Sequence, residues 1–215
     1  MVSNKYRLRD VPKGKKLEHF FTYYKPHLFY AIVFSLLIGY TVYGLLKPKP
    51  DLQVMWLSGA YTMECEQELR ENCAALEWDT NGDGVVTVTV TQVDFGKSYE
   101  EMSYAVKSEL VALIAAQDYS FFLVNDNAMA WMRENEILGT YGDAGLTDFG
   151  GEEEYLCIPV EKLGFLRGKH DEPLEGLYLC VTPTPEQDQD RQEAYKRQME
   201  ALRRALAEHG LSATE

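Results

Sequence analysis

The sequence predicts a three-layer, doubly wound α/β domain with a mostly parallel sheet, preceded by a single transmembrane helix. Three observations carry this prediction. An uncharged apolar run occupies residues 28–46, valine and threonine alternate over residues 86–91, and strand-like and helix-like segments alternate over residues 52–135. Strands that alternate with helices require right-handed crossovers and a parallel sheet that is covered on both faces.

The apolar run from Leu28 to Leu46 has 19 residues and contains no charge, Asn, Gln or Pro. A helix of that length rises about 28 Å, close to the hydrocarbon thickness of a bilayer. A signal peptide has a shorter apolar region followed by a small-residue cleavage site, and a buried core helix carries more polar residues. We therefore expect an uncleaved membrane-spanning helix over residues 26–46, with a signal peptide or a core helix as the alternatives.

The charges on either side of this run predict its orientation. The segment before the run holds seven basic and two acidic residues, whereas only Lys47 and Lys49 follow it closely. By the positive-inside rule the N-terminus is cytoplasmic and the C-terminal part is extracellular, so the protein is expected in the cell membrane. The expected divisions are a basic cytoplasmic segment (1–25), the membrane helix (26–46), a stiff Lys-Pro stalk (47–50), an extracellular α/β domain (51–209) and a frayed tail (210–215).

The part that follows the stalk is strongly acidic. The whole chain has a formal charge of −13, and its first 50 residues hold nine basic and two acidic residues, so the remainder carries about −20. Such a charge excludes nucleic acid as a partner, because phosphate binding needs a basic face. It also argues against a domain that lies flat on anionic lipid. Solubility accounts for the acidity, and cation binding is the sharper interpretation.

Taken in order, the domain begins with an apolar run that ends at Ser58-Gly59, which predicts a buried strand. Thr62 is placed to cap the next helix, and Ser98 begins the one after it. A loop with five glycines follows the third helix, and prolines stop the last strand. The expected strands are 52–57, 85–93, 118–124, 155–160 and 177–181, and the expected helices are 62–76, 98–116, 128–135 and 186–208.

The segment 79–84, Asp-Thr-Asn-Gly-Asp-Gly, matches the first half of a calcium-binding loop. The oxygen-bearing residues at its positions 1, 3 and 5 are Asp79, Asn81 and Asp83. Position 12, which needs a bidentate carboxylate, is Val90, so Asp94 or Glu77 would have to complete the site. The sequence therefore predicts weak calcium binding at best, and the alternative is a turn in which glycines supply positive φ angles.

Four cysteines lie in the domain, an even number that permits disulfides in an outward-facing protein. Cys65 and Cys73 are eight residues apart on a predicted helix, about 12 Å, which is too far for a bond. Cys157 and Cys180 occur in strand-like runs that can be neighbours, so this pair is the predicted disulfide. The alternative is four buried thiols.

A ligand-binding rim is expected where the parallel strands end, because open α/β sheets bind ligands beyond their carboxyl ends. The candidate rim residues are Ser58, Gly59, Tyr61, Asp94, Asn125 and Asp126. Ordinary strand-to-helix loops have the same composition. No nucleophile, zinc, P-loop or dinucleotide motif occurs, which favours a protein without catalytic residues, enzymatic activity or an organic cofactor.

Three parts of the chain carry a resemblance to a known group of proteins. They are the run from His19 to His27 with the apolar span after it, the segment 47–57, and the segment 79–90. Together they resemble membrane-anchored proteins of Gram-positive, Firmicutes-type bacteria whose outer part is similar to one lobe of the type 2 extracellular (periplasmic) solute-binding fold. The resemblance implies an α/β lobe tethered to the outer face of the membrane. A complete solute-binding protein has two lobes, and residues 51–215 supply one.

Two functions follow as hypotheses. The first is a non-enzymatic interaction, accessory or sensing domain that engages a protein partner or a second copy of itself at the cell surface. The alternative is a single lobe that captures a small solute, related to the substrate-binding proteins of ABC transporters. A concave pocket with convergent polar groups at the strand ends would favour the alternative.

Overall fold

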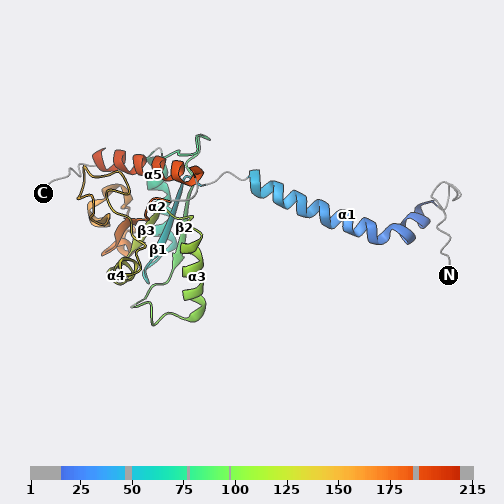
Figure 1. Cartoon of the computed structure of the whole chain (residues 1–215), viewed down its shortest axis with the longest axis horizontal. Helices are drawn as coiled ribbons and strands as arrows, with labels where there is room; N and C mark the ends of the chain where they lie inside the picture. Colours follow the sequence, from blue (N-terminus) through green and yellow to red (C-terminus); the bar gives the residue numbers. More distant parts are fainter. Residues whose placement is uncertain (1–15, 47–49, 77, 97, 186–188, 209–215) are drawn as a thin grey trace. The chain divides into compact units, whose positions relative to one another are not determined.

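The chain forms two compact units, residues 1–49 and 50–215 (Figure 1). The computed structural model describes residues 16–46, 50–76, 78–96, 98–185 and 189–208, and in the first helix it describes the side chains of His27 and residues 29–43. Most of the predicted basic head, most of the stalk and the frayed tail lie outside the described residues.

The first unit contains one long helix, α1 (Lys16–Leu46). Large apolar side chains are exposed along its described part, with exposed fractions from 37% at Val33 to 78% at Tyr40. The hydroxyl of Thr41 donates to the carbonyl oxygen of Leu37 at 2.9 Å, so this polar group is satisfied within the helix. Among the described residues, no helix is long and apolar enough to cross a membrane.

The second unit is an α/β domain built on a five-stranded sheet with the order β2-β1-β3-β5-β4. Its strands are β1 (Leu52–Leu57), β2 (Val88–Val93), β3 (Phe121–Val124), β4 (Cys157–Pro159) and β5 (Tyr178–Val181), and its helices are α2 (Met63–Ala75), α3 (Tyr104–Ala115), α4 (Asp126–Glu134) and α5 (Gln189–Glu208). Strand β1 pairs in parallel with β2 on one side and with β3 on the other.

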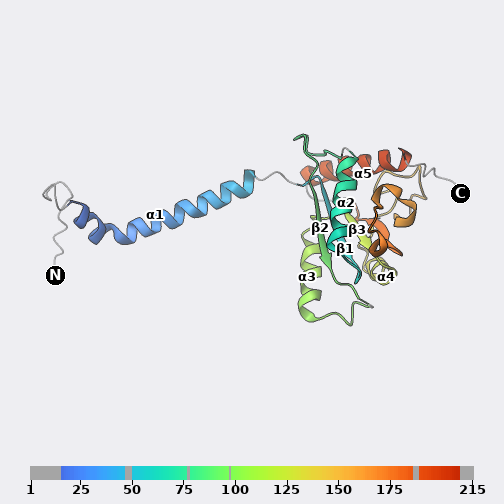
Figure 2. The same cartoon turned by 180° about the vertical axis from the view of Figure 1, so that it is seen from behind.

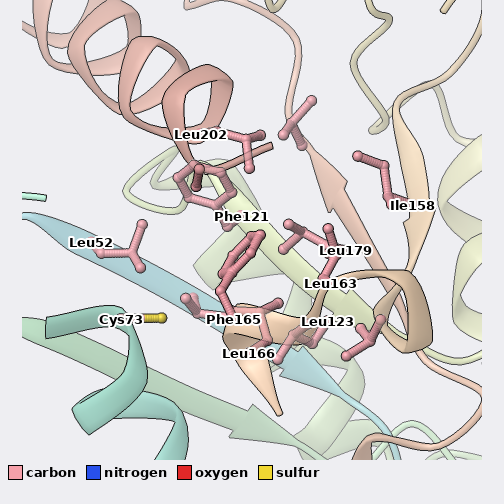
Figure 3. Close-up of a cluster of buried hydrophobic side chains, with 14 of the residues drawn as sticks. Leu52, Cys73, Phe121, Leu123, Ile158, Leu163, Phe165, Leu166, Leu179 and Leu202 are labelled. Atoms are coloured by element: carbon pink, nitrogen blue, oxygen red, sulfur yellow. The ribbon is translucent and has the colours of Figure 1, made fainter. Parts of the chain in front are cut away.

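Helices cover both faces of this sheet, as the three-layer prediction requires (Figure 2). The alternation of side chains along β1 separates the two halves of the core, because successive side chains point to opposite faces. Leu52, Val54 and Trp56 pack with α2, α5 and the segment 160–177, whereas Met55 and Leu57 pack with α3 and α4. Figure 3 shows the first of these clusters, where side chains of α2 and α5 converge with side chains of β1, β3, β4 and β5.

The sheet is mixed, so the predicted parallel arrangement holds for its core strands and not for β5. Strand β5 pairs antiparallel with β3 and with β4, so the parallel half consists of β2, β1 and β3. The reason lies in the connection between β4 and β5. A parallel neighbour needs a crossover, usually an α-helix, whereas this connection contains only the short 3-10 turns 160–162, 164–166 and 172–174. The chain therefore returns beside β4 in the opposite direction.

Several strand and helix boundaries in the structure differ from those predicted. Strand β2 begins at Val88 rather than residue 85, because β1 begins at Leu52, its register partner. Helix α3 begins after Ser103, whose side chain accepts a hydrogen bond from the backbone of Val106, so Ser98 is not its cap. Helix α4 begins at Asp126, two residues earlier than predicted. Thr62 caps α2 as predicted, and residues 186–188 of the last predicted helix lie outside the described residues.

Gly139 occupies a position with no room for a side chain. Its N–H donates to the carbonyl of Val181 at 2.8 Å, and its own carbonyl accepts from Leu156 at 3.0 Å. A Cβ atom here would lie 2.3 Å from the carbonyl oxygen of Thr182. The close approach of these two backbones holds the segment after α4 against the end of β5.

We predict that Gly139→Ala lowers the free energy of unfolding by about 1–3 kcal/mol, because the new methyl group must push two hydrogen-bonded backbones apart. Gly164→Ala is the matched control, since a Cβ there meets no atom within 4 Å, and we expect it to change stability by less than about 1 kcal/mol. Urea denaturation of the full chain measures both. Equal stability of the two variants would contradict the close packing at Gly139.

Candidate functional site

The loop between α2 and β2 folds around its own acidic side chains. Both carboxylate oxygens of Asp79 accept backbone N–H groups, from Gly82 at 2.6 Å and from Gly84 at 2.9 Å. The side chains of Asn81 and Asp83 each accept from the backbone two residues further on. Gly82 and Gly84 have φ angles of 77° and 81°, which glycine adopts without strain. The repeated Asn-Gly and Asp-Gly pairs therefore produce this compact turn.

Asp51 lies beneath this loop, immediately before β1, and only 1% of it is exposed. Its Oδ1 accepts hydrogen bonds from the backbone of Thr80 at 2.8 Å, from the backbone of Asn81 at 2.9 Å, and from the Thr80 hydroxyl at 3.2 Å. Its Oδ2 accepts from the backbone of Thr87 at 2.9 Å. The carboxylate thus joins both ends of the loop to the start of the central strand.

Helix α5 also binds this loop and the residue before β1. The side-chain amide of Gln198 donates to the backbone carbonyl of Asp51 at 2.7 Å, and the Arg197 guanidinium donates to the carbonyl of Thr80 at 2.9 Å. Gln198 is buried, so this bond forms away from water. The loop, the first strand and the last helix therefore meet at Asp51.

Asp51, Asp79 and Asp83 each place a carboxylate oxygen within 4.8 Å of the others, a cluster that can hold a metal ion. The three carboxylates differ in what they can offer. A carboxylate has about four lone-pair positions, and Asp51 already accepts four hydrogen bonds, whereas one is found on Asp83. Asp79 and Asp83 are therefore the better ligands, and Asp51 mainly shapes the loop.

The structure corrects how the predicted calcium loop is completed. Asp94 follows the last residue of β2, whereas the loop precedes its first, so Asp94 lies at the opposite end of that strand. Glu77 lies outside the described residues. Sequence reasoning missed Asp51, whose signal was a single charged residue between the stalk and a buried apolar run.

The predicted rim residues follow strand ends that lie side by side. Leu57 is in register with Val93 on one neighbour and with Val124 on the other, so the residues after these strands share one edge. A Cβ atom at Gly59 would lie 3.4 Å from the Asp94 carboxylate, which shows how closely the first two loops approach.

Most of these rim side chains have local partners. Ser58 accepts from the backbone of Ala60 at 3.1 Å, and Asn125 caps α4 by accepting from Ala128 at 2.8 Å. The Tyr61 ring packs edge-on against Trp56, with ring centroids 5.4 Å apart.

Asp126, in the first turn of α4, lies beside the Tyr178 hydroxyl, which donates a hydrogen bond to it. Its negative charge and this bond raise the pKa of Tyr178. The predicted rim therefore consists largely of helix caps and packing contacts, and ligand binding there stays a prediction.

A cavity of about 510 Å³ lies at the other end of the strands, away from the predicted rim. It is bounded by the end of α3, the start of β3 and the chain that leaves β5. Its lining combines apolar and polar groups: Leu113, Ile114, Gln117, Tyr119, Glu136, Ile137 and residues 182–185 contribute. Sequence reasoning placed the pocket at the other edge because it assumed a parallel sheet, in which β5 would not end here.

The four cysteines are thiols in the structure. Cys65 and Cys73 are buried on the same face of α2, and their predicted separation along that helix explains why they form no pair. Cys157 and Cys180 occupy directly opposed positions on β4 and β5, with their sulfur atoms 2.8 Å apart. These two cysteines are therefore neighbours in the sheet, as predicted, and a disulfide between them stays a prediction.

Comparison with known proteins identifies no relative. No protein-family model, no curated protein and no solved structure matches the chain. The function is therefore argued from the residues themselves.

We predict that Asp51→Ala destabilises the domain by about 3–5 kcal/mol, because three backbone N–H groups lose a buried charged acceptor. Asp83→Ala removes a single exposed hydrogen bond of the same loop and serves as the matched control, with a cost below about 1 kcal/mol. Urea denaturation in the presence of a chelator separates this effect from metal binding. Similar losses in the two variants would show that Asp51 is not the anchor of the loop.

Proposed function

We propose that the protein is a non-enzymatic module anchored in the cell membrane by residues 28–46, with its acidic α/β domain on the outer face as an interaction or accessory domain. The observation that carries this proposal is the uncharged apolar run of residues 28–46, which lies in α1 between a basic N-terminal segment and an acidic domain. The fold by itself assigns no activity.

The exposed side chains of α1 support the membrane anchor. In water the apolar surface of residues 29–43 would cost about 25 cal/mol for each Å² left uncovered, whereas lipid chains cover it at no such cost. The remaining polar groups are few, and the Thr41 hydroxyl bonds to the helix itself. The apolar run in the sequence of this helix continues to Leu46.

The distribution of charge supports the orientation. Basic residues before the helix favour the cytoplasmic side, and the strong negative charge of residues 51–215 keeps that domain away from the anionic surface of the membrane. An outward-facing, acidic domain on a short proline-containing stalk is suited to contact partners beyond the membrane surface.

The acidic loop supports calcium as the cation that this domain meets outside the cell. Calcium prefers oxygen ligands, and Asp79, Asn81 and Asp83 present them with Asp51 behind. Six to eight ligands are usual for calcium, so a loop with three or four protein ligands would leave several positions to water and bind weakly, in the millimolar range of extracellular modules.

The cavity at the far edge of the sheet favours a second candidate, in which the single lobe captures a small solute. Its volume of about 510 Å³ falls within the range typical of ligand pockets. Native mass spectrometry of the purified protein discriminates the two candidates. A reproducible extra mass of small-molecule size assigns the cavity a solute, and a bare chain favours the interaction module.

We predict that protease added to intact cells of a bacterium with a single membrane removes residues 51–215 and leaves a protected fragment that contains α1. A variant in which Lys13, Lys15 and Lys16 are replaced by glutamate is the control, because it removes three of the seven basic residues of the head and should raise the protected fraction of the domain. Full protection of the wild-type domain, with the protease active on a known surface protein, would refute the proposed orientation.

We predict that calcium at about ten times its dissociation constant stabilises the domain by about 1.4 kcal/mol, which raises the melting temperature by about 3–6 °C. Asp79→Asn and Asp83→Asn should abolish this shift, since each removes a ligand charge. Asp94→Asn removes the same charge at the other end of β2 and should leave the shift intact. An unchanged melting temperature up to several millimolar calcium would rule out the metal site.

A further inference from the structure

Two cysteines face each other across the antiparallel end of the sheet. Cys157 on β4 is in register with Cys180 on β5, so their side chains leave the sheet on the same face. Their sulfur atoms lie 2.8 Å apart as thiols. A disulfide bond is about 2.0 Å long, so bond formation requires the two sulfur atoms to approach by less than about 1 Å.

The two thiols differ in their access to solvent. Cys180 is 0% exposed and belongs to the core cluster that includes Met55 and Phe122. Cys157 lies at the margin of that cluster and is half-buried, beside Tyr155. Strand β4 is also the outermost strand of the sheet, so it has a neighbour on one side only among the described strands. Cys157 is therefore the more exposed of the two residues and the better placed for attack on an incoming molecule.

The more exposed of the two cysteines, Cys157, also has the lower thiol pKa. The hydrogen bond from the Cys180 thiol lowers the pKa of Cys157, and the nearby Arg133 guanidinium adds to this effect against the opposing influence of burial. Burial is the main cause that raises the pKa of Cys180 well above its ordinary value. Arg133 is held in place above the Tyr155 ring, 5.3 Å from its centre. The accessible sulfur is thus also the one that ionises first.

We propose that Cys157 and Cys180 form a redox-active pair that exchanges with organic disulfides, with Cys157 as the attacking thiolate and Cys180 as the resolving thiol. The Cys157 thiolate attacks one sulfur of the disulfide, forms a mixed disulfide and releases the other half as a thiolate. The Cys180 sulfur then attacks the Cys157 sulfur, the second half departs as a thiolate, and the Cys180 proton passes to this departing thiolate. Two electrons pass from the cysteines to the disulfide, which leaves as two thiols.

The other two cysteines provide a reference within the same chain. Burial raises the pKa of Cys65 to about 11 and that of Cys73 to about 12, and neither sulfur is exposed. Reactivity toward disulfides follows the thiolate fraction and access. The pKa of Cys65 is about two units above the ordinary value for a cysteine, so its thiolate fraction near neutral pH is about 100-fold smaller than that of an ordinary thiol.

The test treats the reduced full-length protein with oxidised glutathione and follows each cysteine by peptide mass spectrometry after acid quenching. We expect Cys157 and Cys180 to be consumed together, two glutathione thiols to be released for each chain, and Cys65 to react at least about 100-fold more slowly. Cys180→Ala should accumulate a stable glutathione adduct on Cys157. Cys157→Ala should leave Cys180 unmodified, because that sulfur is buried. Reduced glutathione in excess should then restore both thiols in the wild-type chain.

Other results overturn the proposal. Attack at Cys65 or Cys73 as fast as at Cys157 would mean that position in the fold does not select the thiol. Resistance of the wild-type pair to oxidised glutathione would make it a pair of core thiols. A bond that forms and then resists reduced glutathione in the folded protein would make it a structural disulfide. If Cys180→Ala fails to fold, the transient adduct on Cys157 in the wild-type time course decides the order of attack.

Discussion

The buried carboxylate of Asp51 is the interaction on which the arrangement of the domain depends. It stands where the chain enters the sheet, and its four hydrogen bonds fix the loop before β2 and hence the start of that strand. The backbone of the same residue pairs with Thr87 and with Gln198, so β2 and α5 are both placed against β1. Backbone N–H groups that converge on a buried anion offset its loss of hydration. One residue therefore sets the register of the parallel half and the position of the last helix.

The sheet combines two halves of different character. Its parallel half has the doubly wound arrangement. Helices α2 and α3 pack on opposite faces of the sheet, so β1 is buried on both faces. The antiparallel half arises because β5 is inserted between β3 and β4. This insertion moves the end of β5 to the edge opposite the predicted rim, and it brings the cavity and the cysteine pair into existence. The cavity and the cysteine pair therefore depend on the strand that departs from the expected topology, whereas the acidic loop belongs to the parallel half.

Local patterns predicted the elements well. The bounds of β1 and the cap at Thr62 were predicted correctly, because a buried strand and a capped helix are encoded by neighbouring residues. The errors concern long-range partners. Residues 85–87 have strand-like composition, but no strand among the described residues pairs with them. The direction of β5 depends on a connection that contains no α-helix. The acidic loop was recognised from its spacing, whereas Asp51 joins it from 28 residues earlier and has no local pattern.

The route by which the chain enters the domain has a mechanical consequence. Pro50 leads directly into β1, a strand that is bonded to β2 through six register pairs and to β3 through four. A force applied at Pro50 along the axis of β1 shears its hydrogen bonds to both neighbours together and does not open them one after another. The Asp51 carboxylate is the first attachment to take the load. A domain entered through an interior strand resists extension from its N-terminal end more than a domain entered through an outer strand.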